Sequence, residues 1–185
     1  MKLNELTLKQ ALEELQNKNV SATEIWEACQ EEITRKNEAL NVFVHQADAD
    51  SSPESSSIDL SDTPLLGAPL ALKDNFCTKD QPTTASTNVL RDFRPPFDAT
   101  VVARLREAGA TFLGKTNLDA WAPGSSTETS DFGLTRNPRN PAYVPGGSSG
   151  GSAAPVAAKP CLAALGSETA GPVRQPARPC CAVGF

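Results

Sequence analysis

The stretch Gly146-Gly147-Ser148-Ser149-Gly150-Gly151-Ser152 is the most distinctive part of this 185-residue sequence. Glycines adopt positive φ angles and let other segments approach the backbone, so glycines around adjacent serines are typical of a tight functional loop. A flexible Gly/Ser linker and an anion-binding nest have the same composition. Neither alternative accounts for two other features of the sequence: Lys73, which ends an apolar strand-like run, and the segment GSETAGPVR at residues 166–174.

The segments around this loop alternate between helices and short apolar strands. We expect strands at residues 70–73 and 111–113, separated by a helix that Asp98 caps and Gly109 ends. Residues 114–152 are rich in Gly, Ser, Thr, Asn and Pro, and long loops of this kind are usually functional or disordered. An Ala-rich helix is expected at 151–158, although Pro155 disturbs it unless it falls in the first turn. This alternation predicts an α/β layer architecture.

The N-terminal region has a helical pattern. Apolar residues at i, i+3, i+4 and i+7 predict a helix over residues 7–18, with Thr7 as its N-cap. A capping-box pattern at residues 21–24 begins a second helix that runs to about Asn37. Ile25, Cys29 and Ile33 are expected to face inward. A short strand is expected at 41–45, followed by a surface loop at 49–63 that is either an insertion or an interdomain linker.

The composition excludes several classes of function. The 17 Lys and Arg against 22 Asp and Glu give a net charge of -5, which argues against a surface that grips nucleic acid. No apolar run reaches the roughly 20 residues of a membrane span, so no membrane association is expected. The N-terminus has neither a signal-peptide nor a transit-peptide pattern, which predicts a cytoplasmic location with an organelle as the alternative.

Cysteine and histidine usage predicts no metal site. The five cysteines lack CxxC spacing and the chain has one histidine, so a zinc site is not expected and the thiols are predicted to be reduced. His45 lies in an apolar stretch and is predicted to be a partly buried strand residue. Hydrolytic chemistry in this chain therefore requires a base other than histidine.

Residues 109–116, GATFLGKT, match the GxxxxGK[ST] phosphate-loop string. That motif requires a strand before the loop and a helix after it, so that backbone N–H groups surround the phosphates. In this chain a helix precedes Gly109 and the intervening residues are themselves apolar and strand-like. We therefore interpret the match as accidental.

Several strings, in order, resemble the amidase-signature family. They are GAPLALKDN at 67–75, GKTNLD at 114–119, GSSTE at 124–128, TRNP at 135–138, the GGSSGGS loop, and ALGSETAG at 164–171. Within the family they are most similar to the A subunits of glutamyl-tRNA(Gln) amidotransferases. The resemblance implies a mixed central sheet flanked by helices. It assigns residues 1–64 to an N-terminal helical region with a surface loop, and 65–185 to the N-terminal part of the signature core, after which family members continue.

The resemblance also implies the chemistry. Family members hydrolyse carboxamides with a Ser–cis-Ser–Lys triad in which a neutral lysine is the base. By motif position the lysine is Lys73 and the bridging serine is Ser148. The remaining implied supporting and oxyanion positions are Ser149, Thr169, Ala170 and Gly171. A lysine acts as a base only when burial or nearby positive charge lowers its pKa, and the apolar strand before Lys73 fits such burial.

The chain departs from the family pattern at the nucleophile. The family run Gly-Ser-Asp-Thr-Gly-Gly-Ser-Ile-Arg reads GSETAGPVR at residues 166–174, which puts Pro172 at the nucleophile position. Proline has no hydroxyl to acylate and no N–H to donate. Ala170 adds a Cβ to the expected oxyanion turn, and Ser167 is expected to be too displaced to replace the nucleophile unless the loop is rebuilt. We therefore predict that the chain does not hydrolyse amides.

The resemblance further implies partners. An A subunit releases ammonia from glutamine for amidation of Glu-tRNA(Gln) by a B subunit, which uses ATP and Mg²⁺ and contacts the tRNA, and a C subunit clamps the two together. The A subunit itself needs no cofactor. Two alternatives remain open: a general amidase acting on small amides, and a non-catalytic remnant that docks on the partner subunits.

Overall fold

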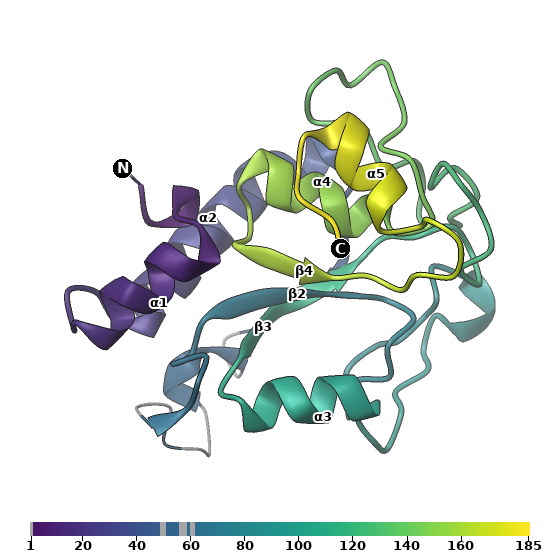
Figure 1. Ribbon diagram of the computed structural model, residues 1–185. Coiled ribbons are helices and arrows are strands. Elements are labelled where there is room, and N and C mark those ends of the chain that lie inside the picture. The colour runs from purple at the N-terminus through teal and green to yellow at the C-terminus, as the bar shows by residue number, and fades with distance from the viewer. Residues whose placement is uncertain (1, 49–50, 56–58, 60–61) are drawn as a thin grey trace.

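The computed structural model describes residues 2–48, 51–55, 59 and 62–185, and has an α/β architecture (Figure 1). Its central sheet has the strand order β1-β3-β2-β4. The strands are β1 (Phe43–Gln46), β2 (Pro69–Lys73), β3 (Thr111–Thr116) and β4 (Ala163–Leu165). β1 is antiparallel to β3, whereas β2 is parallel to both β3 and β4. The mixed sheet flanked by helices that the sequence implied is confirmed.

Helices cover both faces of the sheet. Figure 1 shows α3 on one face, and α1, α2 and α4 on the other. The helices are α1 (Leu8–Gln16), α2 (Ala22–Leu40), α3 (Thr100–Glu107), α4 (Gly150–Ala158) and α5 (Arg174–Cys180), and the 3-10 turns are η1 (Leu3–Glu5), η3 (Pro53–Ser55) and η5 (Asn88–Leu90). Within the described residues no helix combines the length and apolarity needed to cross a bilayer.

The pleat of the strands separates two apolar clusters. Ala71 and Leu113 pack with α2 and α4, whereas Leu72 and Phe112 pack with Val102 of α3. This is the period-two alternation of a sheet that is buried on both faces. The larger cluster joins the N-terminal helices to the sheet, so residues from both ends of the chain share one core.

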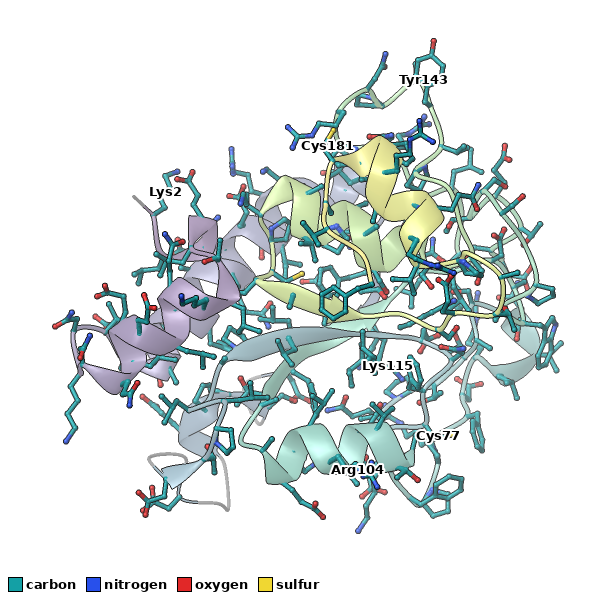
Figure 2. All side chains as sticks on the ribbon, viewed as in Figure 1. Lys2, Cys77, Arg104, Lys115, Tyr143 and Cys181 are labelled. Atoms are coloured by element: carbon teal, nitrogen blue, oxygen red, sulfur yellow. The ribbon has the colours of Figure 1, made fainter. Side chains whose placement is uncertain are left out.

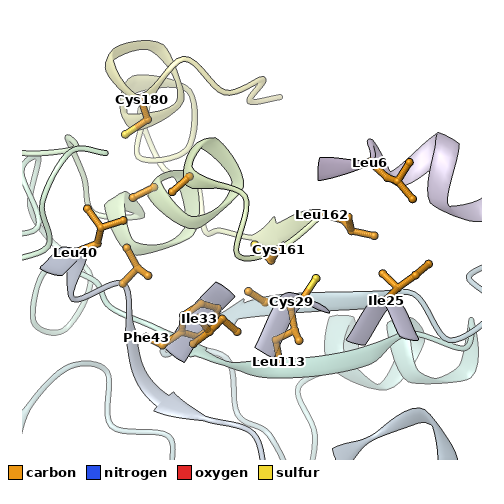
Figure 3. Packing of buried hydrophobic residues seen from close by; sticks show 14 of the residues in the cluster. Leu6, Ile25, Cys29, Ile33, Leu40, Phe43, Leu113, Cys161, Leu162 and Cys180 are labelled. Carbon is orange, nitrogen blue, oxygen red and sulfur yellow. The ribbon is translucent and has the colours of Figure 1, made fainter. Parts of the chain in front are cut away.

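The N-terminal helices begin where their caps predict. Thr7 and Ser21 each accept a backbone hydrogen bond at their helix start, and both form complete capping boxes. Figure 3 shows Ile25, Cys29 and Ile33 spaced along α2 beside Leu113 of β3, and these α2 side chains are fully buried as expected. The helix runs a few residues beyond Asn37.

Some local expectations are wrong. Asn41 adopts a left-handed conformation that ends α2, so β1 begins at Phe43 rather than at 41. Asp98 does not cap α3: its carboxylate accepts from Lys79 N and Arg106 Nε, and Ala99 is the N-cap. Pro155 lies beyond the first turn of α4, where it is buried and the helix continues around it.

The expected loops are only partly tested. Within 49–63, residues 49–50, 56–58 and 60–61 lie outside the described residues, and η3 forms at Pro53–Ser55. The expected loop at 114–152 begins later than predicted, because β3 extends through Thr116. The phosphate-loop string is thus a turn followed by a strand, which confirms that the match is accidental.

Replacing Ile33 by alanine should lower the free energy of unfolding by about 2–5 kcal/mol, because it removes buried methyl groups from the core and leaves a cavity. Glu31→Ala, on the exposed face of the same helix, is the control and should change it by about 0.5 kcal/mol or less. Urea unfolding followed by circular dichroism measures both. Equal effects of the two substitutions would contradict the assigned core.

Candidate functional site

Lys73 is the centre of a buried polar cluster at the carboxyl end of β2. Its side chain is fully buried, and its Nζ donates to Ser148 Oγ at 2.7 Å, Ser149 Oγ at 2.8 Å and Ser167 Oγ at 2.8 Å. The first two serines lie immediately before α4, and Ser167 follows β4. Three segments that are distant in sequence therefore meet at one amine.

Burial changes the acid–base behaviour of this amine. Loss of solvent lowers the pKa of Lys73 to about 8, although the carboxylates of Asp119 and Glu168 favour the charged form. Desolvation disfavours the charged state because the protein interior solvates an ion less well than water does. A lysine with this pKa has a substantial neutral fraction at mildly alkaline pH and is able to accept a proton.

The glycines of the 146–152 loop are required by close contacts. A Cβ on Gly147 would lie 2.6 Å from Asp119 Oδ2, and one on Gly151 would lie 2.2 Å from Asn117 O. The loop therefore packs tightly against its neighbours and is not a flexible linker. The Gly147–Ser148 peptide bond is cis, in agreement with what the resemblance implied for the bridging serine.

Asp119 anchors this loop, a role that the sequence analysis did not identify. The carboxylate of Asp119 is fully buried and accepts backbone hydrogen bonds from residues 126–129, and Asp119 N donates to Ser148 O at 3.3 Å. It thereby connects the GSSTE segment to the serine loop. The signal in the sequence is an acidic residue three positions after the buried strand β3, in an otherwise uncharged stretch.

The segment 166–174 passes directly over the serine loop. Ser149 N donates to Pro172 O at 3.1 Å, which places Pro172, the predicted nucleophile position, beside the serines. Glu168 fixes the segment, because its carboxylate accepts from Val173 N at 2.5 Å and pairs with Arg174 at 2.8 Å. Among the described residues no hydrogen bond is donated by the N–H groups of residues 169–171.

Two expectations for this segment need correction. Ser167 is not displaced from the site, since its Oγ lies within hydrogen-bond distance of Lys73 Nζ. The strand pairing of β4 with β2 carries the residues after Leu165 to the same sheet end as Lys73. Ala170 is exposed and its φ is not positive, so its methyl group fits the turn without strain. Thr169 is also exposed, and Gly171 has a φ of +139°.

Residues 24–185 match the Amidase family model. The chain belongs to the amidase-signature family. It is 46% identical to the A subunit of the glutamyl-tRNA(Gln) amidotransferase of a Synechococcus strain, over 100% of this chain and 39% of that protein. The crystal structure of the corresponding A subunit from Thermotoga maritima superposes with a TM-score of 0.83 at 38% identity, covering 96% of this chain and 37% of the other.

Other amidase-signature enzymes have the same fold. The peptide amidase of Stenotrophomonas maltophilia superposes with a TM-score of 0.81 at 32% identity, covering 92% of this chain and 38% of that one. The chain thus spans about two fifths of the length of the relatives it matches.

A second buried lysine, Lys115, lies on the opposite face of the sheet from Lys73. Lys115 Nζ lies 3.3 Å from Asp74 Oδ1 and donates to Phe76 O and Thr83 Oγ1, both at 2.9 Å. Figure 2 shows Lys115 on the side of the sheet that α3 covers. Burial lowers the pKa of Lys115, whereas the Asp74 carboxylate favours its charged form. Lys115 is therefore a structural ion-pair partner rather than a phosphate ligand.

The remaining candidate chemistry in this amidase-signature chain is structural. His45 is half-buried in β1, and loss of solvent lowers its pKa, in agreement with the expected strand histidine. All five thiols are free, and burial raises the pKa of Cys29 and Cys180 to about 12. In the described part of the chain, no group of His, Cys, Asp and Glu side chains is arranged to hold a metal ion.

The lowered pKa of Lys73 predicts a pH-dependent stability. Between the folded value of about 8 and the ordinary value of 10.5, the unfolded chain binds a proton that the folded chain does not. The free energy of unfolding of the wild type, relative to Lys73→Met, should therefore rise as pH rises through this window. Urea unfolding at pH 7, 8, 9 and 10 on both proteins measures the difference, in which the thiol contributions cancel. A difference that is independent of pH would contradict the lowered pKa.

Replacing Lys115 by methionine should cost about 3–5 kcal/mol of stability, because the buried Asp74 carboxylate then has no cation beside it. The control is Lys9→Ala, which removes a solvent-exposed ion pair with Glu13 and should cost at most about 1 kcal/mol. Chemical denaturation midpoints compare the two variants. A loss for Lys115→Met as small as that for Lys9→Ala would show that the buried pair contributes little.

Proposed function

We propose that this chain is an amidotransferase A-subunit homologue that has lost amide hydrolysis because Pro172 stands at the nucleophile position. The hydrogen bond from Ser149 N to Pro172 O is the observation that carries the proposal, because it supports the assignment of Pro172, which has no hydroxyl, to the nucleophile position. Removing a serine nucleophile from other hydrolases costs on the order of a millionfold in turnover.

The remaining triad positions keep an arrangement suited to the family's chemistry. Lys73 is the proposed base and Ser148 the proposed relay, joined by a 2.7 Å hydrogen bond. The N–H groups of Thr169, Ala170 and Gly171 are the proposed oxyanion donors, and Ser149 supports the loop. A carbonyl oxygen that gains negative charge is stabilised by such preorganised donors. What is missing is a hydroxyl at residue 172.

In an intact A subunit this site would release ammonia from glutamine for amidation of Glu-tRNA(Gln). We propose that any ATP, Mg²⁺ and tRNA contacts belong to the B subunit, and that the C subunit bridges the other two. The net charge of -5 supports this division, because an acidic surface does not attract the phosphate backbone of tRNA. The proposed remaining role of this chain is docking on the B and C subunits.

A general amidase acting on small amides is the second candidate function. The superposition with the peptide amidase of Stenotrophomonas maltophilia supports it. Pro172 would affect both candidate functions in the same way. The two functions differ instead in the amide that is hydrolysed and in whether partner subunits are needed. Ammonia release from glutamine and from small aryl or peptide amides, each with and without B and C subunits, separates them.

Ammonia release from glutamine by the wild-type chain should be no greater than that by Lys73→Met, because neither contains a complete triad. A coupled glutamate dehydrogenase assay, run with and without B and C subunits of the Synechococcus relative, measures this release. Pro172→Ser supplies the missing hydroxyl and is the matched gain-of-function variant. Release by the wild type that disappears in Lys73→Met would contradict the proposed loss of amide hydrolysis.

The docking role predicts that tagged B and C subunits of the Synechococcus relative retain this chain during affinity purification after co-expression. Lys73→Met should be retained equally, because the buried amine is not at a surface. Recovery of neither partner with the wild-type chain would rule out the docking role while leaving the amidase-signature fold unaffected.

A further inference from the structure

We propose that Ser167 is an acylatable nucleophile that Lys73 activates and that reacts with activated esters of small apolar acids. This inference is independent of the proposed loss of amide hydrolysis, because it concerns a different attacking atom and a different leaving group. It begins from the position of Ser167, the third hydroxyl on the Lys73 amine.

Ser167 combines a contact to the lysine with access from solvent. Ser148 and Ser149 are each 1% exposed, whereas Ser167 is partly exposed. Its Oγ lies 2.8 Å from Lys73 Nζ and 3.1 Å from Asn75 Nδ2. When Lys73 is neutral, its lone pair is able to take the Ser167 proton, and the Asn75 amide remains as a donor to the oxygen that is left. Of the hydroxyls on Lys73, Ser167 is therefore the one a substrate reaches.

The residues after Ser167 supply groups for a developing oxyanion. The N–H groups of residues 169–171 donate to no acceptor among the described residues. A Cβ built on Gly171 meets no atom within 4 Å, so there is open space beside this part of the backbone. Glu168 holds the segment in place through Val173 N and Arg174. Fixed donors next to open space are what a tetrahedral intermediate requires.

An apolar cavity adjoins the same position. It has a volume of about 540 Å³ and is bordered by Gly166, Ser149, Val156, Leu162 and Val173, among others. Ser149, which borders the cavity, shares the Lys73 amine with Ser167, because both hydroxyl oxygens lie 2.8 Å from Lys73 Nζ. An acyl group on Ser167 Oγ would therefore lie close to this apolar space. This favours a small alkyl acyl group over a charged one.

The acylation step balances without a further reactant. Neutral Lys73 Nζ takes the proton of Ser167 Oγ as Oγ forms a bond to the acyl carbon of the ester. The tetrahedral intermediate then breaks its bond to the alcohol oxygen, and a p-nitrophenolate leaves with its electron pair and without a proton. Lys73 keeps the proton as an ammonium and releases it to solvent. An amide nitrogen must be protonated in order to leave, whereas p-nitrophenolate leaves without a proton. Ser167 can therefore be acylated by the ester even if the chain does not hydrolyse amides.

Incubation of the full chain with p-nitrophenyl butyrate tests the proposal. We expect p-nitrophenolate release with an equivalent amount of butyryl group found on Ser167 by peptide mass mapping. Ser167→Ala should lose this label, and Lys73→Met should acylate at least about 10²-fold more slowly, because its general base is gone. Asp131→Asn, remote from the cluster in sequence and without a contact to Lys73 or Ser167, is the matched control and should react as the wild type does.

The pH dependence separates activation by Lys73 from simple exposure. The acylation rate of the wild type should rise with pH and level off above about 8, as Lys73 becomes neutral. A serine that is exposed but has no base beside it should be acylated at a rate that follows the hydroxide concentration, without a plateau. Peptide mass mapping of the acylated wild type tests the proposal without relying on the folding of any variant. Butyryl groups on surface lysines or on the exposed Cys181, with none on Ser167, would overturn the proposal. Ammonia release from glutamine is measured separately, so either proposal can fail alone.

Discussion

Keeping the Lys73 amine out of water is the constraint on which the rest of the site depends. A buried lysine is costly unless its polar atoms are hydrogen-bonded, and here hydroxyls rather than a carboxylate contact it directly. Neutral acceptors satisfy the amine without fixing its charge, so burial lowers its pKa instead of being offset by an ion pair. The loops that supply these hydroxyls must then be held rigidly, which explains the glycines and the buried Asp119 carboxylate around them.

The sheet makes this arrangement possible by placing its two buried lysines on opposite faces. Lys115 of β3 lies opposite Leu72 of β2, and Leu72 belongs to the cluster under α3. Lys73, one residue later, points to the face that α4 covers. Lys115 therefore keeps Asp74 as its partner, and that carboxylate does not neutralise the effect of burial on Lys73. Two lysines in one sheet acquire different chemistry because a strand alternates its side chains.

The sequence predicted the features that local physical chemistry determines. Capping boxes at Thr7 and Ser21 and the apolar spacing of α2 specify those helices without reference to the remainder of the chain. The errors occurred where a distant contact decides. Asp98 does not cap α3, because its carboxylate accepts from Lys79 N and from the Arg106 side chain instead, and Pro155 is buried within α4. Ser167 was judged too distant because spacing along the chain does not reveal that β4 pairs with β2 beside Lys73.

The cluster around Lys73 does not depend on the side chain of residue 172, the predicted nucleophile position. Within the part of the chain that the structure describes, every hydrogen bond from Lys73 Nζ goes to Ser148, Ser149 or Ser167, and Pro172 contributes only its carbonyl, to Ser149 N. Because every residue has a backbone carbonyl, this contact needs no particular side chain at residue 172. The burial that lowers the pKa of Lys73, and the three hydroxyls that contact its amine, therefore do not require a hydroxyl at residue 172.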